Sequence, residues 1–213
     1  MDYYEKGVQR YELSHKDGNR YYVDEARWMS YYYQMRMLLA SGGGGKILEI
    51  GPGNNFMQRM LSEYFNEYST YDVDPQSSPT FLGFESLSEI PPKTYDTCCA
   101  FQVLEHMDFN EALKFLEHMV SITKGQIIIS LPVAIPTWRI FLSIPKLKGK
   151  KFIIENFFVK KKSMKFDGVH YWELGNKDIN VQDFEKILSK YGEVESFRNF
   201  YNPYHHFFKC DIK

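Results

Sequence analysis

Lys46-Ile-Leu-Glu-Ile-Gly-Pro-Gly-Asn-Asn55 is the stretch that decides the fold. Its first five residues form a short apolar run that is typical of a buried strand, and Gly51-Pro52-Gly53 ends this run. Helical spacing follows from Phe56 to Tyr64. A strand that ends in a glycine turn before a helix is typical of α/β proteins, which bind ligands at the carboxyl ends of their strands.

Strands and helices alternate along the rest of the chain. We expect strands at 68–73, 95–101 and 126–131, a helix at 111–121, a further helix at 181–191, and final strands at 194–200 and 205–212. The turn at 201–204 allows the last two strands to pair antiparallel. The sequence therefore predicts an α/β fold with a doubly wound, mostly parallel sheet, helices on both faces and an antiparallel C-terminal strand.

Two segments lie outside this alternation. Residues 24–40 place apolar side chains at helical spacing, namely Ala26, Met29, Tyr33, Met37 and Leu38, and four glycines follow at 42–45. We interpret residues 1–45 as an N-terminal helical cap with a glycine linker, and residues 46–213 as a single domain. Residues 132–178 are too long for an ordinary loop, so we expect a lid-like insertion that covers a substrate.

Composition excludes several classes of protein. The 213 residues are 44% apolar and 25% charged with a net charge of −1, which excludes a disordered chain and disfavours a uniformly basic nucleic-acid binder. Three cysteines provide neither a disulfide framework nor paired zinc spacing. The first residues lack the apolar core of a signal peptide, and we expect a cytoplasmic protein without a transmembrane segment.

Basic residues are concentrated in one stretch. Eight lysines and a single acid, Glu155, lie between Lys146 and Lys165, and phenylalanines are interspersed among them. Such a stretch attracts an anionic substrate, RNA or the surface of a membrane, and it is equally consistent with a solvated face of the insertion.

Three elements together resemble the class I S-adenosylmethionine-dependent methyltransferases, and in particular their type 11-like subgroup. They are the loop at 48–55, Asp72 at the end of the second strand, and Phe101-Gln-Val-Leu-Glu-His-Met107 at the end of the strand at 95–101, which corresponds to strand four of the family. The resemblance covers about residues 46–131 and implies that the sheet has seven strands. A nicotinamide-binding G-x-G-x-x-G fingerprint would require glycine where this chain has Phe56, which disfavours an oxidoreductase.

The resemblance implies S-adenosyl-L-methionine as the cofactor, with the glycine loop at its methionine part and the acid after strand two at its ribose hydroxyls. The Asp72 carboxylate can accept two hydrogen bonds, which suits the cis-diol of the ribose. Asn55 stands where the family often has a third glycine, and asparagine tolerates the left-handed backbone conformation. The expected cofactor-binding residues are Glu49, Gly51, Gly53, Asn54, Asn55, Asp72, Val73, Glu85, Phe101 and Gln102.

A second conspicuous segment, Asp167-Gly-Val-His-Tyr-Trp-Glu-Leu-Gly175, precedes the last helix. We interpret His170 as the candidate general base, with Glu173 as the alternative base or as the residue that orients it. Tyr171 and Trp172 are the candidate contacts for the acceptor, although a structural aromatic cluster is an equal interpretation. For Glu105 and His106 we favour a structural role, and the sequence indicates no metal site.

The favoured function is methyl transfer to a small-molecule or glycan acceptor, at oxygen, by direct displacement. The Asn/Asp-Pro-Pro-aromatic motif common in enzymes that methylate exocyclic amines does not occur after strand four, where the chain has Ala100-Phe-Gln-Val103. The alternatives are a methyltransferase that acts on RNA or on a lipid-linked acceptor through the lysine-rich insertion, and a non-catalytic module that binds S-adenosylmethionine. The oligomeric state and the acceptor are left open.

Overall fold

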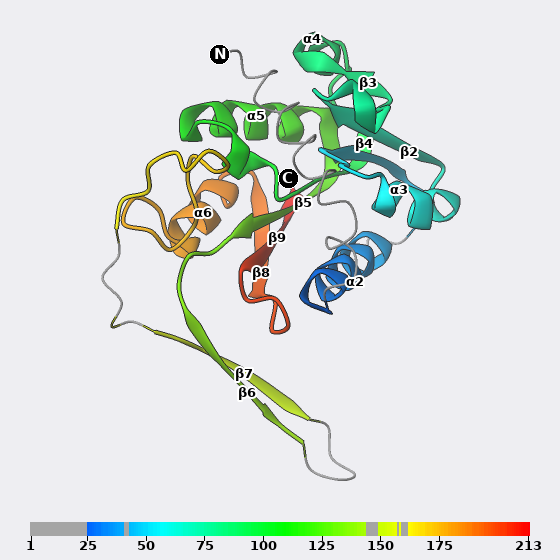
Figure 1. Cartoon of the computed structure of the whole chain (residues 1–213). Helices are drawn as coiled ribbons and strands as arrows, with labels where there is room; N and C mark the ends of the chain where they lie inside the picture. The colour runs from blue at the N-terminus through cyan, green and yellow to red at the C-terminus, as the bar shows by residue number, and fades with distance from the viewer. Residues whose placement is uncertain (1–24, 41–42, 144–148, 157, 159–161) are drawn as a thin grey trace.

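A seven-stranded sheet forms the centre of the molecule (Figure 1). The computed structural model describes residues 25–40, 43–143, 149–156, 158 and 162–213, without the side chains of Phe84 and Glu85. The strand order is β3-β2-β1-β4-β5-β9-β8. The strands are β1 (Lys46–Ile50), β2 (Glu67–Asp72), β3 (Phe81–Leu82), β4 (Tyr95–Phe101), β5 (Thr123–Pro132), β8 (Gly192–Arg198) and β9 (His205–Ile212).

The first five strands run parallel, whereas β9 is antiparallel to both β5 and β8. The predicted fold class is therefore confirmed. Because parallel strands end at the same edge of the sheet, the carboxyl ends of β1, β2 and β4 lie next to one another. The residues that follow these three strands are those in which the sequence motifs occur.

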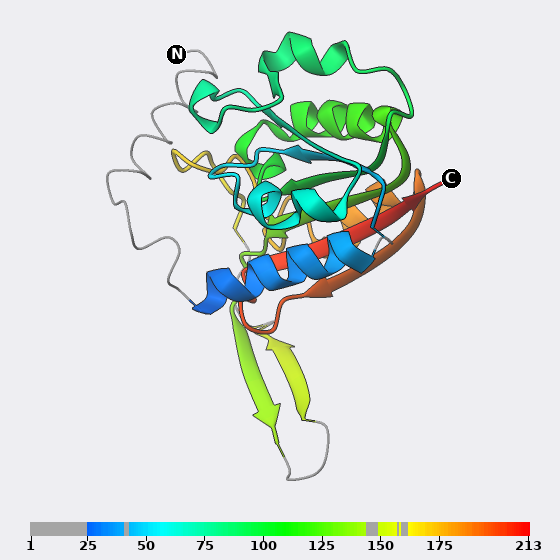
Figure 2. The same cartoon turned by 90° about the vertical axis from the view of Figure 1, so that its right-hand side faces the viewer.

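Helices cover both faces of the sheet (Figure 2). The helices α4 (Gly83–Ser88), α5 (Phe109–Ile122) and α6 (Val181–Leu188) contribute to the larger core, and α2 (Glu25–Ala40) and α3 (Phe56–Leu61) contribute to the smaller one. Successive strand residues point to opposite faces, so Cys98 lies in the larger core and Cys99 in the smaller core. All three cysteines are buried and free.

The buried side of helix α2 lies toward one edge of the predicted apolar stripe, which shares Leu38 with it. Its buried residues are Ser30, Gln34 and Leu38, whereas the rest of the apolar stripe, Ala26, Met29, Tyr33 and Met37, is only partly buried. The reason is a buried polar contact: the Ser30 hydroxyl accepts hydrogen bonds from Asn199 Nδ2 at 3.3 Å and Asn202 Nδ2 at 3.1 Å. Helix α2 is thereby fixed to the turn between β8 and β9. Residues 1–24 of the expected cap lie outside the described residues.

The insertion at 132–178 has two parts of different character. Strands β6 (Thr137–Leu142) and β7 (Lys150–Glu155) pair antiparallel and form an arm that projects from the body in both views (Figures 1 and 2). Arg198 holds the base of the arm, because its guanidinium contacts Glu155 at 2.7 Å and the Ile135 carbonyl at 2.8 Å. From residue 162 the chain returns to the sheet, where the backbone N–H of Tyr171 donates to the Glu105 carbonyl at 2.9 Å.

Candidate functional site

The loop after β1 is held in a conformation that favours glycine and asparagine. Gly51 has φ +65°, and a Cβ at this position would lie 2.6 Å from Val103 Cγ2. Gly53 and Asn55 also have positive φ, at +55° and 57°. Asn55 stabilises the loop through its side-chain amide, which donates to the Ser77 carbonyl at 2.6 Å. The loop therefore keeps its left-handed turn although the third glycine is replaced.

Glu49 lies beneath this loop and is 4% exposed. Its carboxylate accepts a hydrogen bond from the Tyr68 hydroxyl at 3.1 Å. Burial raises the pKa of Glu49 to about 7, and the nearby Asp72 acts in the same direction. The contact with Tyr68 fits a role in bracing the loop, and a role in complementing the positive part of a bound cofactor stays a prediction.

Asp72 is the last residue of β2, beside the end of β1. Its Oδ1 accepts from the backbone N–H of Val73 at 2.7 Å and of Asp74 at 3.1 Å, and burial raises its pKa. Asp74 has a different function, because its side chain accepts from the Gln76 N–H at the start of the short helix η3 (Pro75–Ser77). Asp72 and Asp74 therefore have different contacts, although they are two residues apart.

The other candidate cofactor residues differ in their surroundings. The Asn54 side chain supports the turn just before α3, since its Oδ1 accepts from the Phe56 N–H at 3.2 Å. Gln102 has φ 60°, and its side chain donates to the Ser130 hydroxyl at 3.2 Å. Val73 and Phe101 are partly buried and pack against the larger and smaller cores. The Glu85 side chain lies outside the described part of the structure.

The second predicted segment folds back against η4 (Leu104–His106), the turn that follows β4. His170 Nδ1 and Glu173 Oε1 are 2.8 Å apart, and the Tyr204 hydroxyl donates to the same carboxylate oxygen at 2.5 Å. Burial and the contact with Glu173 raise the pKa of Tyr204. The imidazole rings of His106 and His170 lie side by side, with centroids 4.9 Å apart.

The two candidate aromatic contacts are placed differently. Trp172 is 6% exposed, donates its indole N–H to the Met107 carbonyl at 3.1 Å and packs against Phe109 and Phe184. These contacts favour a packing role for Trp172. Tyr171 is partly buried and lies against Phe166, with ring centroids 4.4 Å apart.

Sequence reasoning missed Tyr204 and the proximity of η4 to His170. Tyr204 belongs to a turn with no chemical motif, so the sequence carried no signal for it. The sequence analysis identified the Glu-His pair at 105–106. His170 follows this pair by more than 60 residues, and only the fold brings the three residues together.

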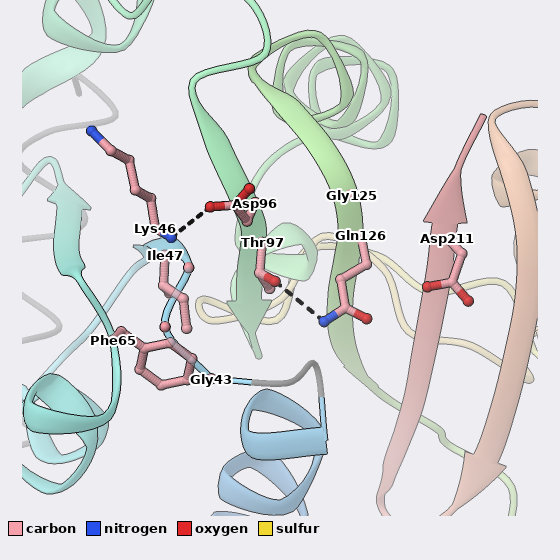
Figure 3. A pocket seen from close by; sticks show the side chains of 11 residues that line it. Gly43, Lys46, Ile47, Phe65, Asp96, Thr97, Gly125, Gln126 and Asp211 are labelled. Atoms are coloured by element: carbon pink, nitrogen blue, oxygen red, sulfur yellow. Dashed lines mark hydrogen bonds between the residues drawn. The ribbon is translucent and has the colours of Figure 1, made fainter.

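A hollow of about 570 Å³ lies at the opposite edge of the sheet, where β1, β4 and β5 begin (Figure 3). Its polar side chains join neighbouring strands: Asp96 accepts from the Lys46 N–H at 2.7 Å, and Gln126 donates to Thr97 at 3.2 Å. We assign these groups a structural role, because ligands of this type of sheet bind at the carboxyl edge.

Comparison with known proteins finds similarity in structure alone. No protein-family model matches the sequence, and no curated protein matches it. A 1,6-didemethyltoxoflavin N1-methyltransferase from Burkholderia thailandensis, solved with its acceptor and S-adenosylhomocysteine, has a TM-score of 0.63 at 13% identity over 99% of this chain and 89% of that chain.

Two further solved structures cover nearly the full length of both chains. An N-methyltransferase from Bradyrhizobium japonicum, bound to S-adenosylhomocysteine, has a TM-score of 0.59 at 12% identity over 99% of each chain. A magnesium protoporphyrin IX methyltransferase from Synechocystis, bound to S-adenosylmethionine, has a TM-score of 0.57 at 17% identity over 100% of this chain and 98% of that chain. The fold is therefore that of the class I S-adenosylmethionine-dependent methyltransferases.

Proposed function

We propose that this protein is an S-adenosylmethionine-dependent methyltransferase that acts on a hydroxyl group of a small-molecule or glycan acceptor. The observation that carries the proposal is the left-handed glycine loop after β1 beside Asp72 at the end of β2. This pair of features lies at the edge of the sheet where such folds bind ligands. The three solved structures of the same fold have S-adenosylmethionine or its product bound.

The cofactor has a cationic sulfonium and amino group, a carboxylate and a ribose diol. In the proposal, Asp72 accepts hydrogen bonds from the two ribose hydroxyls, and Val73 offers an apolar surface to the adenine. The open space at Gly53 allows close approach of the methionine part, because, apart from its two neighbours in sequence, no described residue has an atom within 4 Å of a Cβ built there. Asn54, Asn55, Phe101 and Gln102 shape the rim of the same site.

The acceptor side of the proposed site is built from His170, Glu173 and Tyr204. Tyr171 adds a partly buried aromatic surface. In the reaction, the acceptor oxygen forms a bond to the methyl carbon, the carbon–sulfur bond breaks, and its electron pair stays on sulfur. The hydroxyl proton passes from the acceptor to solvent. The protein contributes alignment of the two reactants and exclusion of water.

Calorimetric titration with S-adenosylmethionine and S-adenosylhomocysteine tests the cofactor part of the proposal. We expect one site with a dissociation constant on the order of 1–100 μM, as for many enzyme ligands. Incubation with methyl-labelled cofactor and fractionated cell extract then tests turnover. Binding without any labelled product would favour a regulatory module, and absence of binding would contradict the proposal altogether.

The arm favours a lipid-linked acceptor over RNA as the second candidate. Its side chains Trp138, Ile140, Leu142, Phe152 and Ile154 lie on one face of the hairpin, which we call the apolar arm face. All five are exposed, Trp138 to 70%. Lys150 lies opposite Leu142 at the end of this face. An exposed apolar face with a lysine at its end suits the interface of an anionic membrane. None of the described helices meets the length and apolarity that crossing a bilayer requires.

Flotation with vesicles tests this second candidate. We expect the protein to bind vesicles that contain phosphatidylglycerol and to bind pure phosphatidylcholine vesicles much more weakly. The double variant Trp138→Ser/Ile154→Ser should lower the bound fraction at least about tenfold, because each buried aromatic or aliphatic side chain contributes about 1.5–3 kcal/mol. Phe141→Ser is the matched control, since Phe141 is 55% exposed on the other face of the same strand. Equal loss in both variants, or no binding, would contradict membrane contact through this face.

A further inference from the structure

Three potential metal ligands meet on the acceptor side of the proposed site. Glu105 and His106 come from η4, and His170 comes from the segment that folds back against it. One candidate ligand atom of each residue lies within 4.8 Å of those of the other two. Glu105 is fully buried and the two histidines are partly buried, so the cluster lies within the fold rather than on an open surface.

The hydrogen bonds of the histidines define which ring nitrogen can bind an ion. His106 Nδ1 lies 3.1 Å from the Val169 carbonyl oxygen. A carbonyl oxygen only accepts, so this nitrogen carries the proton and the lone pair is on Nε2. His170 Nδ1 is engaged in the same way by Glu173 at 2.8 Å. Metal-binding histidines characteristically donate their second nitrogen to a carbonyl or a carboxylate in this manner.

The surrounding contacts hold the ligands in place without an ion. The Tyr171 N–H donates to the Glu105 carbonyl at 2.9 Å, which connects the two elements next to the ligands themselves. The Tyr204 hydroxyl donates to Glu173, which in turn orients His170. The two imidazole rings are tilted by 34° with centroids 4.9 Å apart. Such a supported arrangement lowers the cost of ordering ligands upon binding.

We propose that Glu105, His106 and His170 bind a divalent transition-metal ion of the class of zinc, cobalt or manganese. Two imidazoles and one carboxylate form a ligand set that leaves coordination positions open in catalytic sites. The proposal rests on the proposed function, because the open position would take the acceptor oxygen and favour its ionised form, with the proton passing to solvent. His170 then acts as a ligand, which differs from its sequence-based interpretation as a free general base.

The experiment uses the full chain without a histidine tag, dialysed against a chelator. Titration with Co²⁺, followed by visible absorption and by calorimetry, should give one equivalent bound. His106→Gln and His170→Gln should each weaken Co²⁺ binding by more than about 100-fold, and Glu173→Gln by about 10- to 100-fold, the range for residues that orient metal ligands. His118→Gln is the matched control, because this histidine lies on helix α5, outside the cluster, and contacts the Leu87 carbonyl of helix α4.

Thermal unfolding of each variant verifies that it is folded. If the Glu105→Gln variant does not fold, the variants of the two partly buried histidines still test the site. The metal site would be overturned if all variants bound Co²⁺ as tightly as the wild-type protein, or if the wild-type protein did not bind one equivalent. Titration of the ion-free protein with S-adenosylhomocysteine separates this result from the proposed function. Cofactor binding and turnover without metal binding would support the methyltransferase function and refute the metal site. Metal binding without cofactor binding would refute the proposed function alone.

Discussion

Replacing Asp72 with alanine is expected to weaken binding of S-adenosylmethionine by at least about 100-fold. A hydrogen bond to a charged group contributes about 1.5–3 kcal/mol, and the proposal assigns two such bonds to this carboxylate. Each 1.4 kcal/mol corresponds to a factor of ten in the dissociation constant. Calorimetric titration of the variant beside the wild-type protein measures the effect, and S-adenosylhomocysteine should show the same loss because it has the same ribose.

Asp72 also accepts from the N–H groups of Val73 and Asp74, so the alanine variant removes local support. Asp72→Asn retains an acceptor oxygen for these bonds and is expected to lose affinity with less effect on thermal stability. Asp96→Asn, at the opposite edge of the sheet, is the control and should bind the cofactor normally. Wild-type affinity in a folded Asp72→Ala protein would contradict the proposed cofactor site.

Replacing Glu49 with glutamine is expected to stabilise the protein at pH 8 by up to about 3 kcal/mol and to change little at pH 4. Burial raises the pKa of this acid from its ordinary value of 4.5 to about 7 in the folded protein. Between these values the folded state holds a proton that the unfolded state has released. The free energy of unfolding therefore falls as the pH rises through this window, and above about pH 7 the full cost of a buried charge is present.

Urea unfolding of the wild-type protein and of Glu49→Gln between pH 4 and 8 measures this difference. The Tyr68 hydroxyl can still donate to the amide oxygen of the variant, so the hydrogen bond is retained. Glu63→Gln, an exposed acid, is the control and should follow the wild-type curve. Parallel curves for wild-type and Glu49→Gln would contradict the raised pKa. A bound cofactor cation would offset the cost of the ionised Glu49.

Local patterns were sufficient to predict most of the sheet. The apolar run before Gly51, the alternation of strands and helices and the turn before β9 depend on residues that are close in sequence, and the mostly parallel sheet with an antiparallel C-terminal strand is confirmed. Element ends moved by a few residues, as with β5, which begins at Thr123 and ends at Pro132. Such ends are set by pairing with neighbouring strands and are weakly encoded locally.

Features that depend on distant partners were not predictable in the same way. Periodicity placed an apolar stripe on α2, but a buried Ser30 hydroxyl with two asparagine partners determines which face packs. The apolar arm face has the composition of a core strand, and only the fold shows it exposed. The sequence identifies each member of the candidate metal cluster separately, namely Glu105, His106 and His170. Their proximity depends on the fold, because residues 162–178 return to η4.

The contact of Ser30 with Asn199 and Asn202 determines when folding can finish. Helix α2 is synthesised well before its polar partners, which follow Ser30 by 169 and 172 residues along the chain. Docking of this helix therefore belongs to a late stage of folding, since contacts between distant residues form late. Until β8, β9 and the turn between them have been synthesised, the part of the smaller core that α2 covers stays exposed.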